Sequence, residues 1–142
     1  MHTPAQTIGA VFRTRDDAFA ALRRLATHEL RLGFATPGRD RASLGDAAVA
    51  VVIPGIGPAI AIGELATCLS SNPPEAQDVR TWHEALRRGC SVVVVLVHDA
   101  GEAQSARESL LGGEALDDAR RRWEDDARAS AMAATLRRPS VF

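Results

Sequence analysis

Four consecutive valines, Val92–Val95, constrain the fold of this chain more than any other feature. They lie in the run CSVVVVLVH, which has no polar residue between Ser91 and His98. A strand with one side in water alternates apolar and polar residues, whereas an unbroken run of β-branched residues is typical of a strand buried on both faces. The run therefore predicts the central strand of a sheet that is covered on both sides.

Helices with capping signals follow two of the predicted strands. After a first strand at Thr7–Thr14, the pair Thr14 and Asp17 has the spacing of a capping box. Asp99 and Glu102 repeat this spacing directly after the valine run. Each pair therefore predicts the start of an amphipathic helix that packs against the sheet.

Strands that alternate with amphipathic helices predict an α+β fold, a ferredoxin-like sandwich that contains βαβ units. The second strand is assigned either to Arg31–Thr36, which is slightly favoured, or to Ala47–Pro54. Residues 1–118 are expected to form a single domain. Residues 119–142 are expected to form a charged helical tail that docks through Trp123 and is disordered at its end.

A long apolar segment, VAVVIPGIGPAIAIG at Val49–Gly63, has three interpretations. Seventeen uncharged residues precede Glu64, which is the lower limit for a membrane span, and Pro54 and Pro58 interrupt them. The glycines do not match the G-x-G-x-x-G pattern of a phosphate-binding loop. We therefore expect a helical insertion over about residues 44–70, built as two short apolar helices or as a strand and a helix, joined at a Pro-Gly corner.

Such an apolar segment must be covered by its own domain or by a partner subunit. We expect a homo-oligomer, a dimer or larger, with this segment in the interface. Replacing Ile56 or Ile60 with Asp is then expected to break up the oligomer and leave the fold intact. The candidate interface residues are Val52, Pro54, Gly55, Ile56, Gly57, Pro58, Ile60, Ile62 and Trp123.

The composition argues against several classes of function. The net charge is −1, and the 17 basic residues, all of them Arg, are scattered among 18 acidic ones, which is not a nucleic-acid-binding pattern. Cys68 and Cys90 form no C-x-x-C pair, and Cys90 lies roughly 26 Å from His98 along an extended strand, too far to share a metal. With no G-x-S-x-G motif either, we expect no catalytic residue, no metal site and no cofactor. The N-terminus does not resemble a signal peptide, so a cytoplasmic location is expected.

Four stretches of the sequence together indicate a family. They are GAVFRTRDDAFAALRRL, VIPGIGPAIAIGELA, ALRRGCSVVVVLVHD and ESLLGGEALDD. In this order, over about residues 7–118, they resemble the YflT-type general stress protein family. The resemblance implies a ferredoxin-like α+β fold with a glycine- and alanine-rich central segment, a link to stress response, and no catalytic residues to carry over. The chain departs from the family pattern in its short glycine-rich insertion and in the loop before it.

The leading hypothesis is a non-catalytic, stress-associated protein that acts through self-association or through a protein partner bound by the C-terminal helix. The first alternative is a domain that senses a small molecule or a metal, with its ligand near Arg13, His98 and the Pro54–Pro58 corner. The second alternative is a membrane-peripheral protein anchored by residues 47–69.

Overall fold

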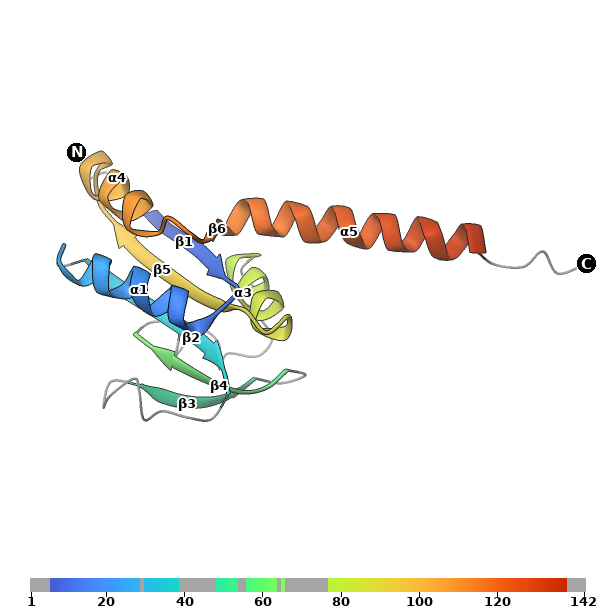
Figure 1. Cartoon of the computed structure of the whole chain (residues 1–142), viewed down its shortest axis with the longest axis horizontal. Coiled ribbons are helices and arrows are strands. Elements are labelled where there is room, and N and C mark those ends of the chain that lie inside the picture. The colour runs from blue at the N-terminus through green and yellow to red at the C-terminus, as the bar shows by residue number, and fades with distance from the viewer. Residues whose placement is uncertain are drawn as a thin grey trace, which may run out of the picture.

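The structure is a computed structural model that describes residues 6–28, 30–38, 48–53, 56–63, 65 and 77–137. The described strands form one six-stranded sheet with the order β3-β4-β2-β5-β1-β6, and every neighbouring pair is antiparallel (Figure 1). In chain order, the elements are β1 (Gln6–Phe12), α1 (Arg15–Ala26), β2 (Arg31–Pro37), β3 (Val49–Ile53), β4 (Gly57–Ile62), α3 (Gln77–Arg87), β5 (Ser91–Val97), α4 (Ala100–Ser109), β6 (Glu114–Ala115) and α5 (Leu116–Arg137). The predicted α+β class, with a C-terminal helix, is confirmed.

The ferredoxin-like part consists of β1, α1, β2, β5, α4 and β6. Its strands have the order β2-β5-β1-β6, which is the arrangement of two interleaved βαβ units. The hairpin β3–β4 and helix α3 are inserted between β2 and β5 along the chain, and the hairpin extends the sheet beyond β2. The insertion therefore adds two strands on one side only.

Strand β5 lies in the middle of the sheet, as its sequence predicts. It pairs with β1 on one side and with β2 on the other. Val93 and Val95 pack into the cluster beneath α1 and α4, whereas Val92 and Val94 pack into the cluster beneath α3 and α5. Each such side chain contributes about 1.5–3 kcal/mol on burial, so the apolar run is explained by helices on both faces.

The N-cap hydrogen bond of each predicted capping box is present. The Thr14 hydroxyl oxygen accepts a hydrogen bond from the Asp17 backbone N–H at 3.2 Å, at the start of α1. The Asp99 carboxylate accepts one from the Glu102 backbone N–H at 2.7 Å, at the start of α4. These two helices lie on the same face of the sheet (Figure 1). Local sequence signals thus set the starts of both helices in this layer.

The prediction of a helical insertion is wrong for residues 49–53 and 57–62, although Leu65, also within the predicted range, is helical. Residues 49–53 and 57–62 form the hairpin β3–β4, in which Val51 pairs with Ala59. Its apolar residues alternate between buried Val51 and Ile53 and exposed Val52, which is the period of a strand. A short apolar run does not distinguish strand from helix, and the two candidates for a second strand prove to be β2 and β3. Residues 44–47, 54–55, 64 and 66–70 of the predicted insertion lie outside the described residues.

The hairpin passes very close to β2 at Gly63. This glycine has a φ of +72°, in the left-handed region that glycine tolerates best. A Cβ at this position would lie 2.3 Å from the backbone oxygen of Leu32. Both the backbone conformation and the spacing therefore require glycine where the hairpin leaves the sheet.

Helix α5 begins at Leu116, so the expected boundary between residues 118 and 119 falls inside it. Its 22 residues span about 33 Å. Only its first turns pack on the sheet, through buried Ala119 and Trp123, and the remainder extends beyond the sheet (Figure 1). The predicted disorder at the end of the tail concerns residues 138–142, which lie outside the described part.

None of the helices in the described part of the chain is both long enough and apolar enough to cross a membrane.

Candidate functional site

The predicted interface residues do not form one surface. Ile60 is fully buried and Trp123 is 6% exposed, so neither is available to contact a partner. Val52, in contrast, is 75% exposed. The expectation that Ile60→Asp would break up an oligomer and leave the fold intact is therefore wrong, because the substitution would place a carboxylate in the protein interior.

The other predicted interface residues surround the turn of the hairpin. Pro58 is exposed, whereas Ile56, Gly57 and Ile62 are partly buried. Ile56 packs against the core cluster beneath α3. Pro54 and Gly55 lie outside the described residues. Among the described residues of the hairpin, the large exposed apolar side chains are thus Val49 and Val52 of β3.

The predicted ligand site near Arg13, His98 and the hairpin corner does not exist as one site. Because β1 and β5 are antiparallel and Phe12 pairs with Ser91, Arg13 lies at the start of β5. His98 follows the other end of β5, roughly 25 Å away. There its Nδ1 lies 3.4 Å from the Glu102 carboxylate, on the exposed surface.

A cavity of about 610 Å³ lies instead around Cys90, and we call it the Cys90 pocket. Several elements meet there: the segment after β1, the turn after α3, strand β6 and helix α5. Each supplies at least one charged side chain. Its polar and charged lining side chains are Arg13, Asp17, Arg88, Cys90, Glu114 and Arg122.

One wall of the Cys90 pocket is the indole ring of Trp123. The guanidinium carbon of Arg88 lies 5.0 Å from the ring centroid, and that of Arg122 lies 5.9 Å from it. Both distances are within the range of cation–π attraction. The same ring is buried where α5 packs on the sheet. Trp123 therefore anchors α5 and also positions two cationic groups.

Arg122 and Glu114 form a bidentate ion pair at the pocket. Arg122 donates from Nη2 to Oε1 at 2.6 Å and from Nε to Oε2 at 3.0 Å. These hydrogen bonds hold the pKa of Glu114 below its ordinary value. The pair therefore ties β6 to the second turn of α5, which follows it directly.

Cys90 is the thiol at the centre of this pocket. Burial raises the pKa of the Cys90 thiol above its ordinary value, although Arg122, Arg88 and Arg13 act in the opposite direction. The thiol is therefore protonated at neutral pH. A protonated thiol is a weak nucleophile, because the thiolate is the reactive form.

The Glu114–Arg122 pair predicts a pH dependence of stability. The pKa of Glu114 is lowered in the folded state, so its carboxylate stabilises the fold above the unfolded pKa of about 4.3. That contribution is lost as the pH falls through the lower folded-state pKa. In urea denaturation at pH 7, the free energy of unfolding should be larger for the parent protein than for Glu114→Gln. The difference between the two should disappear as the pH is lowered toward 3. A constant difference over this range would contradict the ion pair as its source.

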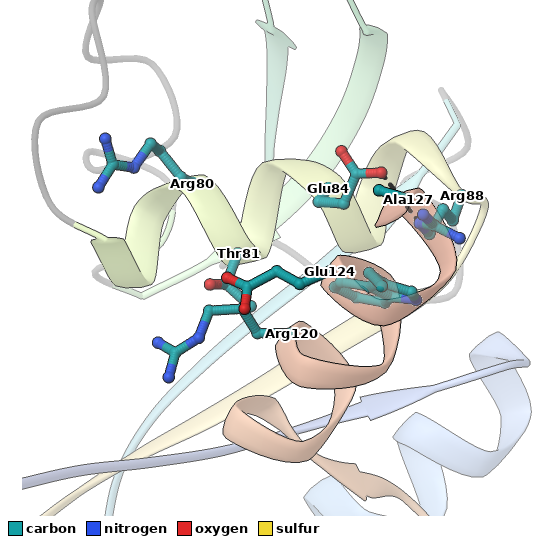
Figure 2. Close-up of a pocket in the computed structure, with 8 residues that line it drawn as sticks. Arg80, Thr81, Glu84, Arg88, Arg120, Glu124 and Ala127 are labelled. Atoms are coloured by element: carbon teal, nitrogen blue, oxygen red, sulfur yellow. Dashed lines mark hydrogen bonds and ion pairs between the residues drawn. The ribbon is translucent and has the colours of Figure 1, made fainter. Parts of the chain in front are cut away.

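A second cavity, of about 420 Å³, lies in the groove between α3 and α5. Figure 2 shows Arg80 and Arg120 at one end of this groove and Arg88 and Ala127 at the other. Positive and negative side chains alternate along it, with Glu124 among them. It shares Arg88 and Trp123 with the Cys90 pocket, so the two cavities are neighbours.

Sequence reasoning did not identify Arg88, Glu114 and Arg122 as site residues. Arg88 is far along the chain from Glu114 and Arg122, and only the folded sheet brings the turn after α3 beside β6 and α5. One local signal was present: the two arginines of RRGC directly precede the buried strand β5. No group of three or more His, Cys, Asp or Glu side chains suited to a metal occurs among the described residues.

Comparison of the chain with family models, with curated proteins and with solved structures finds no match. The resemblance to the YflT-type family therefore stays a prediction.

Proposed function

We propose that the chain is a non-catalytic, stress-associated protein that acts by self-association through the outer edge of β3. The observation that carries the proposal is the exposed apolar character of this edge strand. β3 is the last strand on its side of the sheet, and no described strand pairs with its outer edge. The association with stress comes only from the resemblance to the YflT-type family.

The edge of β3 lacks the features that usually keep sheet edges apart. Natural edge strands commonly carry a charge, a proline or a bulge that discourages pairing with another chain. The sequence VAVVI of β3 contains no charge and no proline, and Val49 and Val52 are 47% and 75% exposed. The backbone N–H and C=O groups on the outer edge of β3 therefore lie beside the exposed apolar side chains of Val49 and Val52.

A second copy of this chain is the partner that fits this edge. Two β3 strands related by a two-fold axis would pair antiparallel, and no charged side chain of either strand would oppose the contact. The two sheets would then join into one of twelve strands. The opposite edge is β6, which has only two residues and leads directly into α5. Because that edge is too short to continue the pairing, the assembly would stop at a dimer.

The non-catalytic part of the proposal is supported by the state of Cys90, which burial keeps protonated. A membrane-peripheral role is less well supported, because Ala59, Ile60 and Ala61 of the expected anchor are fully buried in the protein. A second candidate function is the binding of a small molecule, which the Cys90 pocket favours.

Val52→Lys is expected to convert a dimer into a monomer, because it places a charge on the outer edge of β3. The molar mass from light scattering should fall twofold, and the far-UV circular dichroism should stay unchanged. The matched control is Leu111→Lys, which makes the same kind of change at a residue that is 71% exposed and lies between α4 and β6. A monomeric parent protein, or a dimer that survives Val52→Lys, would overturn the proposal.

A further inference from the structure

Three arginines from separate parts of the chain meet at the Cys90 pocket. Arg13 follows β1, Arg88 follows α3, and Arg122 lies on α5. Their charges act together on the Cys90 thiol. A site assembled from three elements is fixed by the fold rather than by one flexible segment.

Two of these arginines have hydrogen-bond donors that no described residue uses. Arg13 is exposed and forms no hydrogen bond or ion pair within the described part of the chain. Arg88 donates through Nε to Glu84 at 2.9 Å, which leaves its terminal amino groups without a described acceptor. Arg122 is already engaged by Glu114. Arg13 and Arg88 are therefore the groups able to receive a ligand.

The arginines of the pocket favour an anion. The lining contains Arg13, Arg88 and Arg122 against Asp17 and Glu114; Glu84, outside the lining, pairs with Arg88, so Arg13 is the arginine that forms no ion pair with a described residue. The protonated Cys90 thiol adds no charge. Guanidinium groups match carboxylate and phosphate oxygens with paired donors. The ring of Trp123 holds the Arg88 side chain in place. Less side-chain entropy is therefore lost when Arg88 binds a ligand.

We propose that the Cys90 pocket binds a small molecule through a phosphate or carboxylate group, with Arg13 and Arg88 as its cationic partners. The cavity of about 610 Å³ is within the range of small-molecule sites, which is about 300–1,000 Å³. Its largely charged lining suits a polar ligand rather than a lipid chain. This site lies beside β1 and β6, near the edge of the sheet opposite to β3. The inference is therefore independent of self-association through β3.

The test uses sodium pyrophosphate and sodium citrate as probes of the two anion classes, with sodium chloride at matched ionic strength as the reference. Trp123 lies in the pocket wall and reports binding through its fluorescence. In a Cys68→Ser background Cys90 is the only thiol, so protection from iodoacetamide is a second readout. We expect a saturable fluorescence change and slower alkylation of Cys90 with at least one probe. The probe that acts identifies the group that the pocket prefers.

Arg13→Ala is expected to weaken the binding of that probe by at least tenfold. The matched control is Arg107→Ala, an exposed arginine on α4, which packs on the opposite face of the sheet. It should leave binding unchanged. The inference is overturned if neither probe acts beyond matched sodium chloride, or if the two variants weaken binding equally.

Discussion

Trp123→Ala is expected to lower the free energy of unfolding by about 3–5 kcal/mol, the usual cost of truncating a buried aromatic residue. Trp123 is 6% exposed and belongs to the core cluster beneath α3 and α5. Its removal leaves a cavity and also releases the stacked guanidinium groups of Arg88 and Arg122. Typical domains are stable by only about 5–15 kcal/mol, so the variant should unfold at much lower urea concentrations.

Met132→Ala provides the control for this measurement. Met132 also lies on α5, but it is 67% exposed and beyond the part of the helix that packs on the sheet. Its truncation should change the free energy of unfolding by less than about 0.5 kcal/mol. Equal losses in the two variants would mean that the outer part of α5 is packed as firmly as its first turns.

Ile60→Asp is expected to unfold the protein or to destabilise it by about 3–5 kcal/mol, the cost of a buried charge that has no partner. Ile60 is fully buried in β4, between Thr36 of β2 and Ala50 of β3. None of these neighbours can neutralise a carboxylate. Far-UV circular dichroism and the dispersion of amide proton shifts in an NMR spectrum would both report the loss of structure.

Val52→Asp makes the same change of chemistry on the same hairpin at an exposed position. Val52 pairs with Pro58 in β4 and is 75% exposed, so a carboxylate there remains in water. This variant should keep the fold and, under the proposed self-association, lose only the dimer. If the Ile60→Asp protein is folded, the burial of Ile60 in β4 is contradicted, and this residue must lie at the surface.

The sequence was sufficient for the elements whose signals are local. The valine run predicts β5, because only a strand covered on both faces tolerates such a run. The capping boxes at Thr14 and Asp99 predict the starts of α1 and α4, because the side-chain oxygen and the N–H it binds are three residues apart. Each of these features is decided by residues within a few positions of one another.

The hairpin was predicted to be a helical insertion because a short apolar run is compatible with both a helix and a strand. The stretch from Val49 to Ile62 is apolar throughout, and the alternation that marks a strand becomes visible only when Val52 is known to face outward. Neighbouring β2 decides the outcome by offering β4 a strand to pair with. A tertiary contact of this kind is not encoded within the segment itself.

The Cys90 pocket could not be predicted for a related reason. Arg13, Arg88 and Arg122 are separated by 75 and 34 positions along the chain. Apart from the position of Arg88 just before the valine strand, nothing in their local sequence distinguishes them from the other arginines. Only the order of the strands brings β1 and β6 together and places α5 beside the turn after α3. The chemistry of the pocket is thus a property of the topology.

The position of β5 in the chain has a consequence for how the protein is made. Strand β1 pairs with β5 and β6, which both come later in the chain, and β2 also needs β5 to complete its pairing; the last residue of β5 is Val97. At 5–20 residues per second, the 91 positions from Gln6 in β1 to Val97 in β5 take roughly 5–18 seconds to synthesise. During this interval β1 has neither of its partner strands, whereas β2, β3 and β4 can pair with one another once they are made. The apolar residues of β1 are therefore expected to stay without strand partners until translation passes the valine run.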